Sequence, residues 1–322
     1  MKRIGHIYES IYDIENLKLA HKKASKDKAH YRDVIKVNKD PEHCLRLLQD
    51  ILINKEYQVS PYTVKDICDN GKPRRLMKLP YFPDRIVQWA IMLQIEKTLV
   101  NTFTSFTFAS VKNRGIHRAS ILLNRYLKDK EHTTYCLKMD IRKFYPSVNH
   151  RILKELLTHK FKDLDLLDIL FLIIDSMPGD TGIPIGSYLS QYFANFYLAY
   201  FDHWLKEELK IKYIVRYMDD IVILHESKEY LHNIKKKIEE YLKDNLLLTI
   251  KDNWQVFPVG IRGIDFVGYR HFFGYKLLRK SIYKRFRTRA QHVLKQHQRY
   301  KSVSRKDFWS INSHIGWLMW CD

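Results

Sequence analysis

The stretch that decides the fold is Tyr217-Met218-Asp219-Asp220, which lies between two apolar runs rich in β-branched residues. Residues 211–216 read IKYIVR and residues 221–224 read IVIL, so both runs are predicted strands and the acidic pair falls at the tip of a hairpin. Two adjacent carboxylates repel each other, and bound Mg²⁺ would remove that repulsion because hard cations prefer carboxylate oxygens. For an Asp-Asp pair taken alone, a solvated turn is the commoner case, so the function of the pair has to be judged from the rest of the chain.

A third carboxylate, Asp140, lies near the end of another predicted strand, residues 134–141. Leu137 and Met139 alternate there with Lys138 and Asp140, which places Asp140 off the hydrophobic face. The carboxylate is either an ordinary turn residue or a third metal ligand beside the acidic pair. Two Mg²⁺ ions held by three carboxylates can activate an attacking hydroxyl and stabilise a leaving pyrophosphate. Such a reaction needs alignment and charge neutralisation rather than a protein nucleophile.

The charge of the chain predicts a polyanionic partner. Its 322 residues include 56 Lys and Arg against 36 Asp and Glu, a formal net charge of +20. Residues 275–306 contain twelve Lys and Arg and no Asp or Glu. Such a basic segment, which also contains Tyr and Phe, is typical of a surface that follows a nucleic-acid backbone. The alternative is a solvated helical face or a basic tail.

Several function classes find no support in the sequence. The four cysteines form no CxxC pair and the fifteen histidines no HExxH, so neither a zinc-finger nor a zinc-protease pattern is present. The first residues lack the apolar core of a signal peptide. The most apolar run, residues 166–174, is far shorter than the ~20 residues that span a bilayer. We therefore expect a soluble protein of a reducing compartment, without a membrane partner.

The order of predicted elements favours an α+β class. Residues 1–50 are predicted to be helical, and residues 57–79 form a hairpin that turns at Asn70-Gly71. Further helices are predicted over residues 83–99, 148–159, 164–176, 187–209 and 231–242, and short strands over 246–278. Strands separated by helices predict an antiparallel sheet with helices packed on one face.

Two further segments could contact phosphates. Lys72, Arg74 and Arg75 cluster at the first hairpin, which suits either triphosphate binding or a solvated hairpin tip. Residues 182–186 read GIPIG and precede a predicted helix whose first N–H groups could face an anion or a base pair. The segment lacks the Lys of a Walker loop. The alternative to a phosphate-binding or base-pair-binding loop is an ordinary loop that leads into a helix.

Together these segments resemble a reverse transcriptase, and the resemblance covers most of the chain. The stretch Gly71-Lys72-Pro73-Arg74-Arg75, followed by Leu79-Pro80 and Asp84-Arg85-Ile86-Val87-Gln88, looks like the fingers motif of bacterial reverse transcriptases. Residues 138–145 look like the first palm motif, and Tyr217-Met218-Asp219-Asp220 looks like the YxDD box. Residues 248–251 and 263–269 look like the next palm strands and the primer grip. Five motifs stand in the order of the family.

Within that family the chain is similar to the reverse transcriptases of diversity-generating retroelements. Most reverse transcriptases carry Gln-Gly followed by Ser-Pro where this chain has Ile185-Gly186-Ser187-Tyr188-Leu189-Ser190-Gln191. An aliphatic residue replaces Gln, and Gln191 replaces Pro. Three further segments are similar to the corresponding segments of this group: the Met of the YxDD box, residues 253–258 and Gly316-Trp317-Leu318.

The resemblance implies a right-hand polymerase with fingers at residues 1–125, a palm at 126–274 and a basic helical thumb at 275–322. It implies two Mg²⁺ ions, with Mn²⁺ as a substitute, held by Asp140, Asp219, Asp220 and the carbonyl of Ile141. The implied nucleotide-binding residues are Lys72, Arg75, Tyr145, Ile185, Gly186 and Gln191. Lys251 is implied as general acid, Gly268 and Tyr269 as primer grip, and Lys280, Lys284, Arg285, Arg287 and Arg289 as nucleic-acid contacts.

The implied function is error-prone, adenine-mutagenised cDNA synthesis from a template-repeat RNA for targeted gene diversification. The implied partners are that RNA, the RNA/cDNA hybrid, dNTPs and a small basic oligomeric accessory protein. The implied location is the cytoplasm of a bacterial host, with the gene carried by a phage or a mobile element. Two alternatives stay open: a retron or antiphage reverse transcriptase with another RNA partner, and a non-catalytic RNA-binding scaffold with a palm fold.

Overall fold

The computed structural model describes residues 3–69 and 72–322, with the side chains of residue 69 and residues 72–74 outside the description. The chain forms two compact units that interleave along the sequence. The first unit contains residues 1–104, 142–204 and 241–249, and the second contains residues 105–141, 205–240 and 250–322. The division into fingers, palm and thumb at residues 125/126 and 274/275 remains a prediction.

The first unit begins with the predicted helical region. Its helices are α1 (Tyr8–Tyr12), α2 (Ile14–Ser25), α3 (Arg32–Lys39) and α4 (Pro41–Ile53). The side chains of Asp13 and Asp40 accept hydrogen bonds from the first free N–H groups of α2 and α4. A short π-helical turn, η1 (Tyr81–Arg85), leads into α5 (Ile86–Val100), which has buried residues around most of its circumference. Helix α5 is therefore the central helix of this unit.

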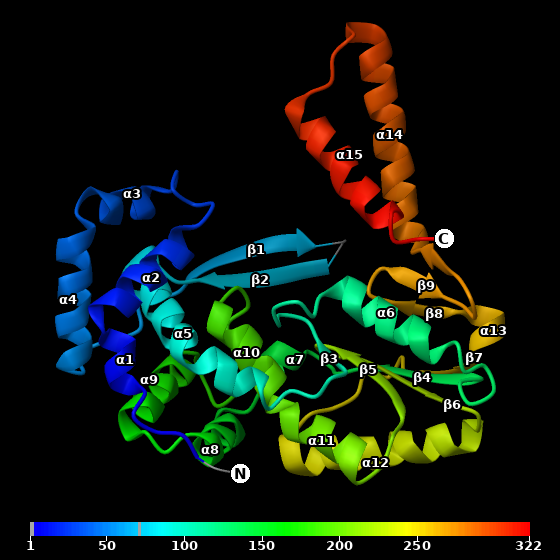
Figure 1. Ribbon diagram of the computed structural model, residues 1–322, viewed down its shortest axis with the longest axis horizontal. Coiled ribbons are helices and arrows are strands. Elements are labelled where there is room, and N and C mark those ends of the chain that lie inside the picture. Colours follow the sequence, from blue (N-terminus) through cyan, green and yellow to red (C-terminus); the bar gives the residue numbers. More distant parts are fainter. Residues whose placement is uncertain (1–2, 70–71) are drawn as a thin grey trace. The chain divides into compact units, whose positions relative to one another are not determined.

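A two-stranded hairpin also belongs to the first unit (Figure 1). Strands β1 (Thr63–Asp69) and β2 (Lys72–Lys78) pair antiparallel, with Asp66 opposite Arg75. The hairpin was predicted over residues 57–79, and its turn at Asn70-Gly71 lies outside the described residues.

The remaining helices of the first unit are α7 (Phe144–Ser147), α8 (His150–Lys160), α9 (Leu164–Asp175), α10 (Tyr188–Tyr197) and the first part of α11 (Ala199–Glu207). The side chains of Asn149, Asp163 and Ser187 cap α8, α9 and α10. The prediction of one helix over residues 187–209 was wrong. The segment is two helices, because the backbone leaves helical geometry at Leu198, where ψ is 0°.

The second unit is built on a five-stranded sheet of order β3-β5-β6-β4-β7. Its strands are β3 (Thr107–Phe108), β4 (Tyr135–Asp140), β5 (Tyr213–Tyr217), β6 (Asp220–His225) and β7 (Gln255–Pro258). The four strands from β5 to β7 pair antiparallel, as predicted. The sheet departs from the prediction at one edge, where β3 pairs parallel to β5.

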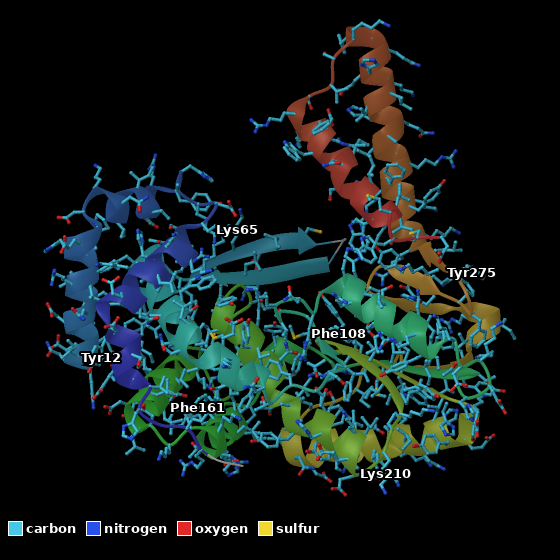
Figure 2. All side chains as sticks on the ribbon, in the orientation of Figure 1. Tyr12, Lys65, Phe108, Phe161, Lys210 and Tyr275 are labelled. Atoms are coloured by element: carbon cyan, nitrogen blue, oxygen red, sulfur yellow. The ribbon has the colours of Figure 1, made fainter. Side chains whose placement is uncertain are left out.

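Both faces of this sheet are covered. Val222 and Leu224 of β6 pack in one cluster with Leu123 of α6 (Ile116–Tyr126), and Phe108 of β3 belongs to the same cluster. Figure 2 shows Phe108 among densely packed side chains. Ile221 and Ile223 point to the other face and are fully buried too. Helix α12 (Lys228–Leu246) runs along that side, opposite α6 (Figure 1). Helices on both faces correct the expectation of helices on one face, because residues of β6 that face each way are apolar.

The chain continues beyond the main sheet with a second, three-stranded sheet. After α13 (Val259–Arg262), strands β8 (Ile264–Phe266), β9 (Tyr269–His271) and β10 (Lys276–Leu278) pair antiparallel. The basic segment then forms α14 (Lys280–Tyr300), followed by α15 (Arg305–Leu318). Within the described ranges, no helix has the length and apolar composition needed to cross a membrane.

Candidate active site

The turn between β5 and β6 carries the acidic pair, as predicted. Tyr217 pairs with Asp220, so Met218 and Asp219 form the two-residue turn, with Met218 at φ +57°. The side chain of Arg216, which is fully buried, donates a hydrogen bond from Nη1 to the carbonyl of Met218 at 2.8 Å. Arg216 therefore supports the turn from within the core. Sequence reasoning missed this residue, although a charged side chain at the end of an apolar strand was the available signal.

The sheet brings the third carboxylate beside the turn. Asp140, the last residue of β4, is the register partner of Asp220. The next residue, Ile141, donates its backbone N–H to the carbonyl of Asp219 at 3.2 Å. Asp140, Asp219 and Asp220 thus lie at the same end of neighbouring strands, which the spacing in sequence could not establish.

Two lysines contact these carboxylates. The backbone N–H of Lys251 donates to the carbonyl of Asp140 at 2.8 Å, and its ammonium pairs with the carboxylate of the same residue. The ammonium of Lys138 lies 3.2 Å from Oδ2 of Asp220 and also donates to the backbone carbonyl of Asp265. Lys251 was predicted near the site, whereas the contact of Lys138 with Asp220 was not predicted.

The electrostatics of the turn reflect crowded negative charge. Burial and then the charge of Asp140 raise the pKa of Asp219 to about 6. Burial also raises the pKa of Asp220, against the opposing effect of the Lys138 ammonium. Oδ1 of Asp220 is buried and accepts no hydrogen bond from the described residues. A bound divalent cation would relieve both the repulsion and the unsatisfied oxygen.

The donor set fits Mg²⁺ by its chemistry. Carboxylate oxygens are the ligands that Mg²⁺ prefers, and one oxygen of Asp220 is available without breaking a hydrogen bond. Across residues 3–69 and 72–322, however, no group of three or more acidic, His or Cys side chains is gathered as a metal site. Asp140 instead pairs with the Lys251 ammonium. Two metal ions therefore stay a prediction that rests on the donor residues.

The residues predicted to contact the nascent base pair line a pocket in the first unit. Ile185 and Gly186 border this pocket, of about 290 Å³, together with Met77 and Gln88. The N–H of Met77 donates to the carbonyl of Ile185 at 3.2 Å, which fixes the loop against β2. Gly186 has φ +111°, a conformation that favours glycine. The hydroxyl of Ser187 donates to Oε1 of Gln88 at 2.9 Å.

The other predicted nucleotide-binding residues also belong to the first unit. Arg75 pairs with the facing Asp66 at 3.2 Å, and both side chains are well exposed. The side chain of Lys72 lies outside the described residues. Tyr145 is in α7 and Gln191 is in α10. Their roles toward a nucleotide stay predictions.

The predicted primer grip is more enclosed than expected. The Tyr269 side chain is fully buried, and its hydroxyl donates to the carbonyl of Trp317 in α15 at 3.3 Å. Gly268 has φ +90°, and a Cβ added there would lie 2.4 Å from the Trp317 ring. The Tyr269 side chain therefore holds α15 against β9, and the primer-grip role of Gly268 and Tyr269 stays a prediction.

The predicted nucleic-acid residues of the basic segment all lie on α14. Four of them, Lys280, Lys284, Arg285 and Arg287, are exposed. Figure 2 shows that the side chains of α14 project outward along most of the helix. Arg289 differs, because its guanidinium pairs with the buried carboxylate of Asp307 in α15. This residue ties the two helices together, and its predicted nucleic-acid contact stays a prediction.

This architecture defines the class of the protein. An α+β fold, with three carboxylates where a hairpin turn meets a neighbouring strand end, is that of a right-hand polymerase. A sequence model of the family described as reverse transcriptase (RNA-dependent DNA polymerase) matches residues 64–271. The chain belongs to the reverse transcriptase family.

Known relatives agree with this assignment. Protein YkfC of Escherichia coli (strain K12) is 27% identical over 173 residues, which cover 51% of this chain and 45% of that protein. The group II intron-encoded protein LtrA of Lactococcus lactis subsp. cremoris is 25% identical over 201 residues, or 59% of this chain and 33% of that protein. The chain thus spans less than half the length of these relatives.

Solved structures show the same fold. The apo telomerase of Candida tropicalis matches with a TM-score of 0.52 and 14% identity, over 70% of this chain and 49% of that chain. The telomerase of Candida tropicalis in complex with a TWJ fragment of telomeric RNA matches with a TM-score of 0.50 and 13% identity, over 84% of this chain and 56% of that chain. At these identities the likeness concerns the fold.

Proposed function

We propose that this chain is an RNA-directed DNA polymerase that joins dNTPs to a primer on an RNA template. The carrying observation is the meeting of Asp140, Asp219 and Asp220 at one end of the sheet, inside the region that the family model matches. The net charge of +20 and the exposed basic residues of α14 support a nucleic-acid partner.

In the proposed nucleotidyl transfer, the residues around the acidic turn have separate roles. Mg²⁺, when bound, would lower the pKa of the primer 3′-hydroxyl and neutralise charge on the triphosphate. Asp140, Asp219 and Asp220 would hold the two ions, together with the carbonyl of Ile141. Arg216 keeps the turn in place through its bond to Met218. Lys251, which pairs with Asp140, would give a proton to the departing pyrophosphate.

A primer-extension assay tests this function. The full chain, purified with the RNA that accompanies it, is given an RNA template, a DNA primer, dNTPs and Mg²⁺. We expect Asp219→Asn to lower extension by about 100-fold or more, because a neutral amide binds a divalent cation far more weakly than a carboxylate does. Asp165→Asn, which changes an exposed carboxylate paired with Lys55, is the matched control and should extend normally. Equal extension by wild type and Asp219→Asn, or none by wild type, would contradict the assignment.

We propose further that the enzyme is error-prone and misincorporates nucleotides opposite template adenines, as in a diversity-generating retroelement. The support is Ile185, which presents an aliphatic side chain at the edge of the pocket beside Met77. An aliphatic side chain supplies contact area without a directional hydrogen bond, so a mispair loses less relative to a correct pair. Ile185→Gln should therefore lower the error rate opposite adenine, and Ile185→Val should leave it unchanged. Sequenced cDNA with the same error spectrum for both variants would refute this role.

The proposed partners are a template RNA, the RNA/cDNA hybrid, dNTPs and a small basic accessory protein that is oligomeric. The proposed location is the bacterial cytoplasm. Sequencing of the RNA that co-purifies with the chain separates this proposal from a retron or antiphage enzyme. A template repeat matching a nearby variable gene supports the proposal, whereas a structured RNA without such a repeat supports the alternative.

A further inference from the structure

The Lys138 side chain contacts several groups near the acidic turn. It lies on β4, two residues before Asp140, and its ammonium contacts Oδ2 of Asp220 at 3.2 Å. The same ammonium donates to the backbone carbonyl of Asp265 in β8 and lies 5.7 Å from the centroid of the Phe266 ring. One side chain thus joins the main sheet to the three-stranded sheet. Only 27% of the Lys138 side chain is exposed, so these contacts are sheltered from water.

The contacts continue from Asp265 to the start of α14. Oδ1 of Asp265 accepts a hydrogen bond from Nε of Arg279 at 2.6 Å. The backbone N–H of Arg279 donates to the carbonyl of Gly268 at 2.9 Å, and Arg279 is the N-cap residue of α14. A continuous series of polar contacts therefore leads from Asp220 through Lys138 to the β8–β9 turn and the root of the basic helix.

The position of Lys138 also decides which oxygen of Asp220 is free. Because the ammonium engages Oδ2, the carboxylate is held in one orientation and Oδ1 stays without a hydrogen-bond partner among the described residues. A ligand that must coordinate through one oxygen gains from such a second contact, which fixes its orientation. Lys251 differs, because its backbone N–H and its ammonium both contact Asp140.

We propose that Lys138 is a positioning residue that orients the Asp220 carboxylate and ties it to the β8–β9 turn at the root of α14. This role rests on the proposed polymerase function for its catalytic consequence. The tie between the two sheets does not depend on that function. A shift in the β8–β9 turn, which a bound primer would contact, is thereby transmitted to a carboxylate of the reaction centre.

The test compares Lys138→Met with a matched control, Lys154→Met. Lys154 is also 27% exposed, pairs with Asp175 and lies 5.4 Å from the Phe171 ring centroid, but it belongs to α8 in the first unit. Each variant is examined by hydrogen exchange of the full chain without added metal, by thermal melting, and by single-turnover primer extension. Lys138→Arg keeps the charge and serves as the conservative variant.

Three results are expected for Lys138→Met. Amides of residues 264–269 exchange several-fold faster than in wild type. The single-turnover rate constant falls by about 10- to 100-fold, the usual loss when a partner of a metal ligand is removed. The dNTP concentration for half-maximal rate stays within about 2-fold, because Lys138 orients the carboxylate rather than binding the nucleotide. Lys138→Arg should recover part of the rate, and Lys154→Met should match wild type in exchange over these residues and in rate.

The opposite results overturn the proposal. Unchanged exchange at residues 264–269 refutes the tie between the sheets, and a rate within about 2-fold of wild type refutes the orienting role. A loss of rate in Lys138→Met that Lys154→Met shares, with an equal drop in melting temperature, assigns Lys138 a purely structural role. If Lys138→Met fails to fold, the same measurements on Lys138→Arg and Lys138→Gln decide, since Gln keeps a hydrogen-bond donor but not the charge. An inactive wild type counts against the polymerase function, while the exchange measurement still tests Lys138.

Discussion

The contact between Gly268 and Trp317 gives a prediction with a built-in control. Gly268 has φ +90°, and a Cβ at this position would approach two atoms of the Trp317 ring to 2.4 and 2.8 Å. Gly274 has almost the same φ, +89°, yet an added Cβ there would meet none of the described atoms within 4 Å. Replacing each glycine with alanine therefore imposes a similar backbone strain, and only Gly268→Ala adds a steric clash.

The magnitude follows from these two contributions. A side chain in the left-handed region costs about 1–2 kcal/mol, which both variants share. Forcing atoms into a packed contact costs about 1–3 kcal/mol more, because Trp317 has to move off the Tyr269 ring, whose centroid lies 5.4 Å away. Gly268→Ala should thus lower the free energy of unfolding by about 1–3 kcal/mol more than Gly274→Ala does.

Urea unfolding of the two variants, followed by tryptophan fluorescence and by circular dichroism, measures the difference. A double-mutant cycle isolates its cause, because Trp317→Ala removes the clashing ring and should make the extra cost of Gly268→Ala disappear. Equal unfolding free energies for Gly268→Ala and Gly274→Ala would refute the steric argument. An extra cost that persists in the Trp317→Ala background would also refute it.

Two further predictions concern buried polar groups. Burial and then the charge of Lys276 lower the pKa of His271 to about 3. The buried neutral imidazole therefore contributes its full stability to the fold above pH ~6.5, and this contribution is lost as the pH falls toward 3. Below pH ~6.5, wild type should lose up to about 1.4 kcal/mol of unfolding free energy per pH unit relative to His271→Gln, and identical pH profiles would contradict this. The Asp163 carboxylate accepts hydrogen bonds from the backbone N–H groups of Ile7, Tyr8 and Leu166, at 2.6, 3.0 and 3.1 Å. Asp163→Ala should therefore cost about 2–4 kcal/mol in chemical denaturation, against less than about 1 kcal/mol for the exposed Asp165→Ala, and equal costs would disprove the cap.

The local elements of the site could be predicted because their signals are local. Alternating and β-branched residues identified β4, β5 and β6, and the two-residue turn left Asp219 at its tip. The Asn-Gly step likewise indicated the β1–β2 hairpin, whose strands the structure confirms. The break of the long helix at Leu198 gave no such signal, since a leucine is a good helix former.

The contacts that link distant segments could not be read from the sequence in the same way. Lys138 looked like an ordinary outward-facing residue of an alternating strand, and its partner Asp265 lies 127 positions further along the chain. Tyr269 looked like a primer contact because of its place in a motif, yet Trp317 covers it. In both cases the deciding partner belongs to the part of the chain after the main sheet, whose three short strands carry too little periodicity to place.

The contacts made by the segment after the main sheet have a common physical consequence. Two side chains with a predicted role in substrate contact, Tyr269 and Arg289, attach α14 and α15 to each other and to β9. The side chain that the sequence left without a role, Lys138, reaches the acidic turn from the same region. Arg279 joins that region to the first residue of α14. A displacement of the helical hairpin is therefore expected to be transmitted to Asp220 through polar contacts. The carboxylates of the acidic turn and the basic helices are therefore expected to respond together when a template and primer bind.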